Sequence, residues 1–417
     1  MRWRAAQAMA IVLLAASVAA AAWGGDRTVV LLLFDGFASA YVSAVPTPTL
    51  ERLRREGAWS HHMTPAFPSI SLTNQTTIST GCWPAQHGIV TNSFLDPQRG
   101  EYDHSHDADW LAGCEHLHSA AERQGVRSAA LGWVGRFSGT RGDLASYTSA
   151  ERRFDEFPTD AQRAEQVIRM LQLPDAERPR LILGYFGGPD QEGHFAGMEA
   201  EATRAAVIET DAIIGRILAA IEALPFHDRV TLIVTTDHGM VPVSWNVNVQ
   251  KLLANHGITA GVRSAGTSAF LYFDDPAAIE PAQAKLSGYA QFDVVRATAP
   301  PADWHIGHGP RVGELIISAK PPYFIEDIKR WPRWTHWLGT WGPEFLWAGF
   351  AIKATHGYPP DTPGVEGILY AWGAGVPAGR EVPSVRAIDV HPTVAHLLGI
   401  EPGTPVDGTV ARALVTR

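Results

Sequence analysis

The sequence predicts an α/β fold in which helices cover both faces of a mostly parallel sheet. The apolar runs Thr28–Phe34, Leu181–Phe186 and Val230–Thr235 are continuous, which is typical of parallel strands buried on both sides. Segments with helical periodicity separate these runs, as in an α/β/α sandwich. The 417 residues are 46% hydrophobic and 18% charged, so the chain has enough apolar side chains for a large core.

The expected elements follow in order along the chain. After the first strand, a helix is expected over Pro48–Glu56, with Thr47 as its N-cap and Gly57 as its stop. The further elements expected in the main domain are a helix at 110–123, a strand at 126–133, helices at 160–171 and 199–224, a strand at 367–372 and a helix at 391–398.

Residues 246–322 differ in pattern from the segments on either side. They contain short strand-like pieces at 269–273 and 314–318 around a helix near 281–287. We therefore expect a small inserted α+β lobe that caps the main domain. The predicted division is a signal peptide at 1–22, a first part of the α/β domain at 23–245, the capping lobe at 246–322 and a second part of the α/β domain at 323–417.

The first residues have the pattern of a secretory signal peptide. Arg2 and Arg4 precede an apolar run, and small residues suited to signal peptidase follow at 20–22. This pattern predicts a periplasmic or secreted protein, and a retained membrane anchor is the alternative interpretation. No other stretch of the sequence is long and apolar enough to span a bilayer.

Charge and cysteine content narrow the class of protein. The formal charge is −9, and it becomes about −11 (−9 − 2) when Arg2 and Arg4 are removed with the signal peptide. An acidic chain is not expected to bind a nucleic-acid duplex, because phosphate contacts require clustered cations. In an exported protein Cys82 and Cys114 can form one disulfide, and two buried thiols are the alternative.

Acidic and imidazole side chains follow the buried strands where those strands end. They occur in the segments FDG, GGPDQEGH, TTDHG and THGY, as Asp35, Asp190, His194, Asp237, His238 and His356. Ligands of parallel α/β sheets bind at the carboxyl ends of the strands, so we expect these groups to meet. Carboxylates and imidazoles without thiolates suit Zn²⁺ and, less specifically, Mn²⁺ or Fe. The sequence therefore predicts a site for two divalent cations, which can clamp a phosphoryl group.

A nucleophile is expected in the hydroxyl-rich segment 64–81, TPAFPSISLTNQTTISTG. A hydroxyl at the N-terminus of a short helix there would lie beside the metals and beside backbone N–H groups directed at a phosphate. Ser69, Ser71 and Thr73 are all candidates on chemical grounds, and a plain N-cap serine is the alternative.

Five segments, FDGF, FPSISLTNQTTISTGCWPAQHGIV, GGPDQEGHFAG, TTDHGM and THGY, are far apart in the chain. In this order and spacing they resemble the nucleotide pyrophosphatase/phosphodiesterase family of the alkaline phosphatase superfamily. The similarity extends from about residue 28 to residue 408. It implies an alkaline-phosphatase-like α/β/α sandwich and a phosphoric diester hydrolase.

The resemblance also implies a role for each candidate residue. One ion would be held by Asp190, His194 and His356, and the other by Asp35, Ser71, Asp237 and His238. Ser71 aligns with the family nucleophile, and Asn74 with a donor to a non-bridging phosphate oxygen. On the lobe, analogy with the family places Trp304, His305 and His308 along the pocket.

The nucleophile segment departs from the family pattern at several positions. Serine replaces the usual threonine at Ser71, which preserves the alkoxide chemistry. Ile70 stands where lysine is common, and Leu72 and Thr73 replace Phe-Pro. These changes leave nucleotide preference open.

The mechanism implied is a double displacement through a phosphoseryl intermediate, with a small phosphodiester or nucleotide as substrate. Two dications (+4), three carboxylates (−3) and one alkoxide (−1) sum to zero, so a singly charged diester is not repelled. No arginine lies beside the nucleophile segment to bind a dianionic monoester in bidentate fashion. The charges therefore favour diesters.

Other functions remain as alternatives. A sulfatase is rejected, because CWPAQ has Gln86 where the formylglycine signal needs arginine. Phosphonoacetate hydrolases share the PSISLTN and PAQHGI patterns and the same ligands, and phosphomonoesterases use a similar two-metal site. A non-catalytic metal-binding homologue is less expected, since every ligand and the nucleophile are present.

The stretch from Trp331 to Trp347 holds five of the fourteen tryptophans. A helix that packs the lobe against the main sheet, a lid over the substrate pocket and a membrane-surface patch are the three interpretations.

Overall fold

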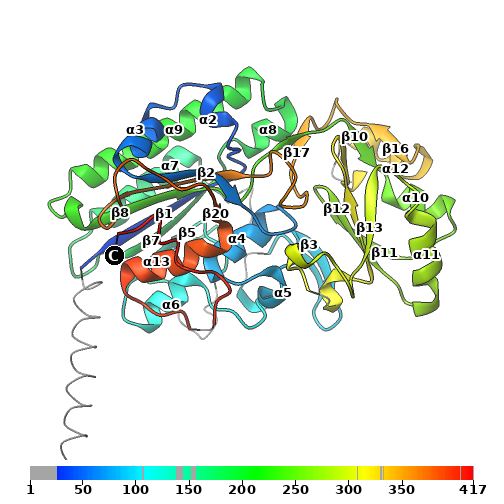
Figure 1. Ribbon diagram of the computed structural model, residues 1–417, viewed down its shortest axis with the longest axis horizontal. Coiled ribbons are helices and arrows are strands. Elements are labelled where there is room, and N and C mark those ends of the chain that lie inside the picture. The colour runs from blue at the N-terminus through cyan, green and yellow to red at the C-terminus, as the bar shows by residue number, and fades with distance from the viewer. Residues whose placement is uncertain are drawn as a thin grey trace, which may run out of the picture.

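Figure 1 shows the computed structural model, which describes residues 26–416 apart from 106–107, 138–143, 152–155, 308, 329–330, 332 and 404. The predicted signal peptide lies outside these residues. Across the described part of the chain, no helix has both the length and the apolar character needed to cross a membrane.

A sheet of nine strands among the described residues forms the main domain. Its centre is parallel. β1 (Thr28–Phe34) lies between β7 (Leu181–Phe186) and β8 (Val230–Thr235), and β5 (Ser128–Leu131) and β6 (Tyr147–Thr148) continue the sheet beyond β7. All three apolar runs that predicted parallel strands are therefore neighbours in the sheet.

The other side of the sheet is mixed. β18 (Gly367–Gly373) pairs antiparallel with both β8 and β2 (Ala58–Thr64). β19 (Arg380–Glu381) and β20 (Val385–Arg386) each pair parallel with β2. The sheet is thus mostly parallel, as predicted.

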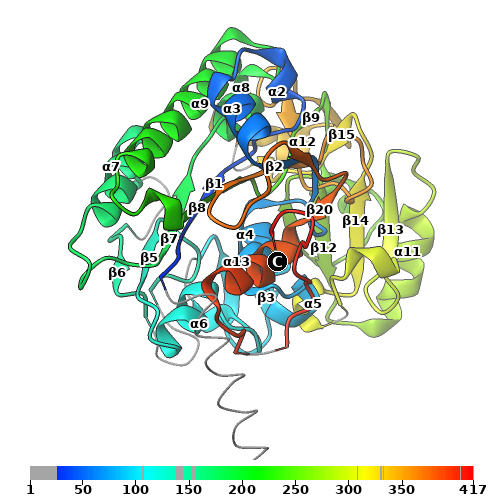
Figure 2. The ribbon, with the colours of Figure 1, turned by 60° about the vertical axis from the view of Figure 1, so that its left-hand side comes forward.

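Helices cover both faces of this sheet (Figures 1 and 2). In β1, residues 29, 31 and 33 pack into one apolar cluster and residues 30, 32 and 34 into another, as the period of two requires. The first face is covered by α4 (Ser71–Thr80), α6 (Leu117–Arg123) and α13 (Val390–Leu398). The second face is covered by α3 (Pro48–Glu56), α7 (Asp160–Leu171) and α9 (Glu201–Glu222). The predicted α/β/α class is confirmed.

One predicted helix is shorter than expected. The helix expected at 110–123 begins only at Leu117, as α6. Gly113 has a φ of +85°, which an α-helix does not accommodate, and Cys114 is bonded to Cys82 in a disulfide. Of the two alternatives for Cys82 and Cys114, the structure contains the disulfide and not two free thiols.

The second lobe is α+β, as expected. Its antiparallel sheet has the order β11 (Gly261–Ala265), β12 (Ser268–Tyr272), β14 (Leu315–Ala319) and β13 (Phe292–Arg296). Residues from α10 (Val249–Asn255) and α11 (Ile279–Leu286) join the apolar core of this lobe.

A smaller sheet of the same lobe extends further along the chain. β10 (Trp245–Val247) pairs with β15 (Tyr323–Phe324) and β16 (Phe345–Trp347). This pairing crosses the predicted boundary at residue 322, and the exact domain division stays a prediction. The remaining short elements are α2 (Tyr41–Ala44), α5 (Pro84–His87), β3 (Ser93–Asp96), β4 (Gly100–Asp103), α8 (Asp190–Ala196), β9 (Val241–Pro242), α12 (Trp337–Trp341) and β17 (Ala354–Thr355).

Candidate active site

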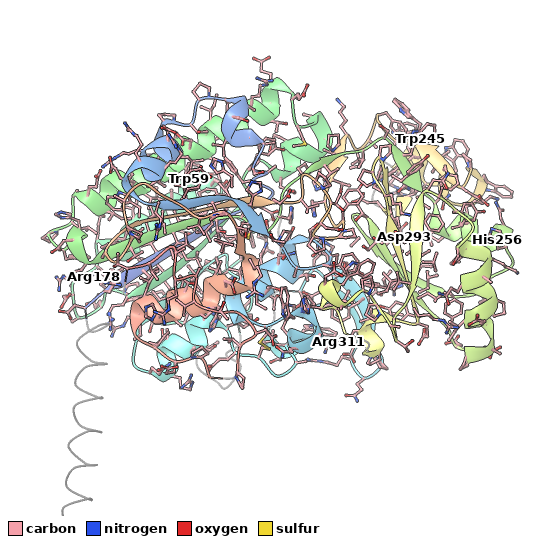
Figure 3. All side chains as sticks on the ribbon, in the orientation of Figure 1. Trp59, Arg178, Trp245, His256, Asp293 and Arg311 are labelled. Carbon is pink, nitrogen blue, oxygen red and sulfur yellow. A yellow bond between two sulfur atoms is a disulfide. The ribbon has the colours of Figure 1, made fainter. Side chains whose placement is uncertain are left out.

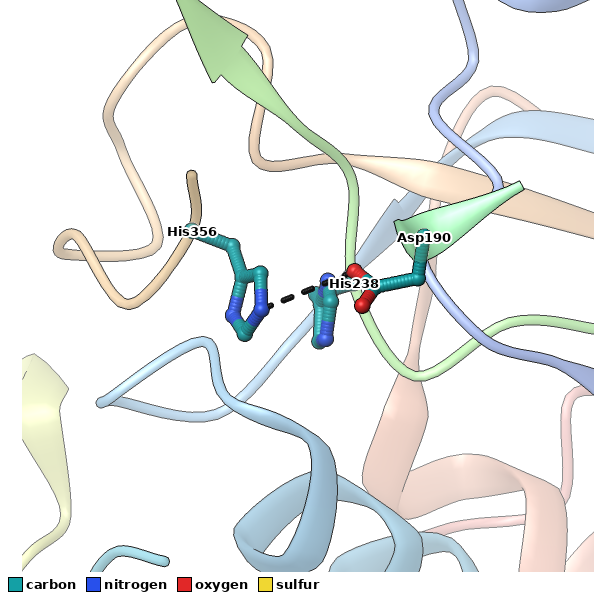
Figure 4. A group of neighbouring side chains, drawn as sticks. All are labelled: Asp190, His238 and His356. Atoms are coloured by element: carbon teal, nitrogen blue, oxygen red, sulfur yellow. Dashed lines mark ion pairs between the residues drawn. The ribbon is translucent and has the colours of Figure 1, made fainter. Parts of the chain in front are cut away.

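Three parallel strands bring carboxylates to one edge of the sheet. Asp35 directly follows β1, Asp237 and His238 follow β8, and Asp190 is the first residue of α8, which comes after β7. His356 directly follows β17 and reaches the same edge from the lobe side. Figure 4 shows Asp190, His238 and His356 pointing toward one another.

The turns at this edge are shaped for close approach. Gly36 has a φ of +65°, and a Cβ there would lie 2.6 Å from Asp190 Oδ1. The loop before α8 is anchored by Asp160, whose carboxylate accepts hydrogen bonds from the Gly187 N–H (2.8 Å) and the Gly188 N–H (2.9 Å). These contacts hold the aspartates of neighbouring strands against each other.

Asp190, His194 and His356 form the first group of candidate ligands. The Nε2 atoms of His194 and His356 lie 3.1 Å apart, and Asp190 Oδ1 lies 3.5 Å from the first and 3.6 Å from the second. Each ring donates its Nδ1–H to a backbone carbonyl, at Ala354 (2.8 Å) and Ser69 (3.0 Å). Because carbonyls only accept, both Nε2 atoms of the neutral rings are acceptors that face each other across a carboxylate.

Asp35, Asp237, His238 and Ser71 form the second group. His238 Nε2 lies 3.3 Å from Asp35 Oδ1 and 3.7 Å from Asp237 Oδ1. Its Nδ1–H is donated to the Gly239 carbonyl at 2.9 Å, so Nε2 is again the atom available to a cation. Ser71 Oγ lies 3.2 Å from His238 Nε2 and 3.4 Å from Asp35 Oδ1.

The two groups are adjacent. The rings of His238 and His356 stack with their centroids 3.6 Å apart. Ligand atoms of His238 lie near Asp190 and His356 as well as near Asp35 and Asp237. The assignment of His238 to the second ion therefore stays a prediction.

Buried carboxyl groups lie close together in this site, so a bound cation would stabilise their ionised forms. Burial and the nearby Asp35 charge raise the pKa of Asp237 to about 7, and burial with the Asp190 charge raises the pKa of Asp35. Burial alone would lower the pKa of His238, but the surrounding carboxylates raise it to about 10.

The opposite holds for His356, whose pKa is lowered well below its usual value by burial and by His238 and His194. The buried Asp190 Oδ1 accepts no hydrogen bond from the residues that the structure describes. Facing imidazole acceptors and a carboxylate oxygen without a donor are the arrangement that a divalent cation satisfies, so these residues fit the predicted metals.

The three hydroxyl candidates are separated by the structure. Ser71 is the first residue of α4 and is partly exposed, whereas Ser69 and Thr73 are fully buried. Ser69 Oγ donates to the Tyr358 carbonyl (2.9 Å) and accepts from the Gly357 N–H (3.1 Å). Of the three, Ser71 alone lies at the helix N-terminus with its hydroxyl beside the ligands.

Asn74 is bound within the loop that precedes α4. Its side chain is fully buried, its Oδ1 accepts from the Ala66 N–H (2.6 Å), and its Nδ2 donates to the carbonyls of Ala66, Pro68 and Ile70. Both amide donors are thus used to fold the loop before α4. The amide of Asn74 therefore points back along the loop, and its predicted contact with phosphate stays a prediction.

A second asparagine, Asn92, lies beside Ser71. Its Oδ1 accepts the Leu72 N–H at 3.0 Å, which fixes the amide beside Ser71 at the N-terminus of α4. The side chain is partly exposed. The sequence reasoning missed it, although the segment HGIVTNS that contains Asn92 lies next to the matched family motif.

Two further residues support the second group. Gln75 Nε2 donates to Asp237 Oδ2 (3.2 Å), and the Tyr185 hydroxyl donates to Asp35 Oδ2 (2.5 Å). Gln75 lies four residues after Ser71, on the same face of α4. Tyr185 pairs with Leu33 in the neighbouring strand. Gln75 lies within the motif that contains Ser71 but had no predicted role, and Tyr185 lies in a strand without a motif.

The lobe touches the nucleophile loop through aromatic rings. Trp304 is buried and stacks on Phe67 with ring centroids 3.7 Å apart, and His305 stacks on Trp83 at 4.1 Å. Their predicted place along the substrate pocket stays a prediction, and His308 lies outside the described residues.

Known proteins resemble this chain along nearly its whole length. Residues 29–359 match the family model described as type I phosphodiesterase / nucleotide pyrophosphatase. An uncharacterized pyrophosphatase/phosphodiesterase of Schizosaccharomyces pombe is 26% identical over 409 residues, which cover 94% of this chain and 81% of that protein. Ectonucleotide pyrophosphatase/phosphodiesterase family member 7 of Mus musculus is 24% identical over 413 residues. The match covers 96% of this chain and 89% of that protein.

A solved structure has the same fold. Murine ectonucleotide pyrophosphatase/phosphodiesterase 5, in an inactive form in complex with AMP, superimposes with a TM-score of 0.81 at 20% identity. The match covers 94% of this chain and 100% of that chain.

Proposed function

This chain belongs to the type I phosphodiesterase / nucleotide pyrophosphatase family, and we propose that it is a two-metal hydrolase of phosphodiester or phosphoanhydride bonds with Ser71 as its nucleophile. The observation that carries the proposal is the position of the Ser71 hydroxyl. It stands at the N-terminus of α4, within 3.4 Å of both His238 Nε2 and Asp35 Oδ1.

The residues that would hold the two cations are those of the two groups. Imidazole and carboxylate donors without thiolate favour Zn²⁺. When bound, two such ions lower the pKa of a coordinated hydroxyl and neutralise charge on the phosphate and the leaving oxygen.

We propose that the reaction proceeds through a phosphoseryl ester on Ser71. Ser71 Oγ forms a bond to phosphorus as the opposite phosphorus–oxygen bond breaks, and the leaving group departs with the electron pair. Water then cleaves the phosphoseryl ester and restores the Ser71 hydroxyl. The Nδ2 of Asn92 would donate to a non-bridging phosphate oxygen, a role that we transfer from Asn74.

The net charge of the metal-filled site and the similarity to family members both favour a diester substrate. The filled site sums to zero charge, from two dications (+4), three carboxylates (−3) and the Ser71 alkoxide (−1), which suits a singly charged diester. The murine relative of known structure was bound to AMP, so a nucleotide diester is one candidate. We further propose export to the periplasm or the medium, as the apolar segment before residue 23 predicts.

The test is a substrate panel with the zinc-loaded protein. We expect turnover of an aryl phosphodiester and a nucleotide diester at least tenfold above that of the matching aryl monoester. A glycerophosphodiester in the same panel shows whether a nucleotide is required. Preference for phosphonoacetate or for the monoester would support the alternative activities instead. Tight binding of two metal ions without turnover of any substrate would contradict an enzyme.

A further inference from the structure

The second lobe carries a surface of exposed aromatic side chains that the proposed reaction does not use. Nine large hydrophobic residues are strongly exposed in the described part of the chain, and six of them gather here with 38% to 79% of their surface exposed. We call these six the aromatic surface: Trp245, Trp334, Trp337, Trp341, Trp347 and Phe350. Exposed apolar groups on this scale mark an interaction site.

Four members of the aromatic surface, Trp245, Trp334, Trp347 and Phe350, are linked by strand pairing and ring contacts. Trp245 of β10 pairs across the small sheet with Trp347 of β16. The Phe350 ring lies 6.0 Å from the rings of both Trp334 and Trp347. Figure 3 labels Trp245 at the upper edge of the lobe.

α12 extends the surface. Trp337 and Trp341 are four residues apart and share one side of this helix, while Leu338 packs into the lobe core. Packing explains the buried Trp331, which was one interpretation of the tryptophan-rich stretch. It does not explain the four other tryptophans of that stretch, which are exposed.

We propose that the aromatic surface docks on a lipid bilayer that contains anionic headgroups. All six side chains are Trp or Phe, and none is Leu, Ile or Met. Tryptophan favours the bilayer interface, where the ring meets the acyl boundary and the indole N–H meets water.

The local charge favours an anionic partner, and the tryptophans favour a bilayer as that partner. Among the described residues of 331–353, Arg333 and Lys353 are basic and Glu344 is acidic, a net charge of +1 (2 − 1) in a chain of −9. Glu344 accepts hydrogen bonds from Asn255 Nδ2 (2.8 Å) and the Tyr289 hydroxyl (3.1 Å). Cations near the surface draw the lobe to anionic lipid.

The surface is linked to the metal centre. The Lys353 N–H donates to the His194 carbonyl at 2.8 Å, and Phe195, next to that ligand, is itself strongly exposed. In Figure 1, α8, β17 and α12 lie along the same upper side of the molecule. Docking would therefore hold the metal centre close to the bilayer.

The test compares vesicle binding of the zinc-loaded full chain with that of a variant carrying Trp334→Ser, Trp337→Ser and Trp341→Ser. Cosedimentation with phosphatidylcholine vesicles that contain about 30% phosphatidylglycerol should show at least tenfold weaker partitioning of the variant. Both proteins carry the same N-terminal segment, so the difference reports the aromatic surface alone. Ile208→Ser on α9 removes an exposed apolar side chain elsewhere and should bind like the wild type.

Two further arms distinguish the outcomes. Arg333→Gln and pure phosphatidylcholine vesicles should each weaken binding, and turnover of a soluble aryl diester should be unchanged in every variant. Equal vesicle binding by the wild type and the triple variant overturns the proposal. So does a dimer of the wild type that the triple variant abolishes, because a second copy would then cover this surface. If the wild type binds vesicles but does not hydrolyse the aryl diester, the proposed reaction is contradicted and the docking is not.

Discussion

The two halves of the metal centre are supported by different kinds of contact. On the nucleophile side, the carboxylates of Asp35 and Asp237 receive hydrogen bonds from a side-chain hydroxyl, a side-chain amide and backbone N–H groups. On the other side, His194 and His356 are oriented by backbone carbonyls. There the buried Asp190 Oδ1 accepts no hydrogen bond within the described part of the chain.

This difference shows how each half depends on its cation. The carboxylates of the nucleophile side are oriented by the protein itself, since their donors come from α4 and β7. The other half brings two imidazole acceptors and a carboxylate oxygen together with no donor among them. We infer that the half with Asp190, His194 and His356 needs its cation to hold these side chains in place. The half with Asp35, Asp237 and Ser71 needs its cation mainly for the reaction.

The largest effect is expected from Ser71→Ala, which removes the bond-forming atom from the preorganised side. We expect kcat to fall by about 10³-fold or more, with two zinc ions still bound, because the other ligands remain. Steady-state rates with an aryl diester and metal analysis by plasma emission measure both quantities. Ser71→Thr keeps the hydroxyl and is the matched control. Retained activity in Ser71→Ala would point to Ser69 or Thr73.

Asn92→Ala and Asn74→Ala separate a substrate contact from a loop contact on the same side. We expect Asn92→Ala to lower kcat by about 10²-fold with little change in stability, because it removes a donor to the transition state. Asn74→Ala should instead lower the free energy of unfolding by about 1–3 kcal/mol, since buried backbone groups lose their partners. Steady-state kinetics and urea unfolding of both variants measure these effects. Loss of kcat in Asn74→Ala together with loss of stability in Asn92→Ala would refute the assignment.

His194→Ala tests the cation dependence of the other half. Zinc bound per chain should fall from two toward one, with affinity at that half weakened beyond the roughly 10–100-fold typical of supporting residues. Metal content after dialysis is the measurement. Loss of both ions together would show that the two halves are not independent.

Tyr185→Phe and Gln75→Ala test the side-chain hydrogen bonds that support Asp35 and Asp237 on the nucleophile side. Each removes one hydrogen bond to a carboxylate, so zinc affinity should fall about tenfold while both ions remain at saturating metal. Competition with a zinc chelator measures this change. An effect as large as that of His194→Ala would break the distinction between the halves.

The smallest expected effect is a pH dependence of metal binding. In the metal-free protein the pKa of Asp237 is raised to about 7 and that of His238 to about 10, so zinc must displace protons from both. Both raised values favour the metal-free fold at low pH and weaken it as pH rises, whereas metal binding strengthens. The gain in melting temperature from zinc should therefore grow between about pH 6 and pH 8.5. A gain that is constant with pH would contradict these protonation states.

The carboxylates and most imidazoles of the site could be predicted from the sequence because they follow strands of a parallel sheet. Residues that follow parallel strands must gather at one edge, so the pattern of apolar runs was enough to predict that Asp35, Asp190 and Asp237 lie together. Their neighbours His194 and His238 followed from the same segments. The direction of the Asn74 amide could not be predicted, because proximity to Ser71 along the helix says nothing about which way an amide points.

By itself, the sequence determined the α/β/α class, the strand ends that carry the acids and imidazoles, and the hydroxyl segment that faces them. These depend on local periodicity and on where each strand stops. Only the tertiary structure decided that Asn92 reaches α4, that Tyr185 and Gln75 hold the carboxylates, and which tryptophans stay exposed. Such contacts join residues far apart in the chain, and packing between elements, which no local pattern encodes, selects each partner.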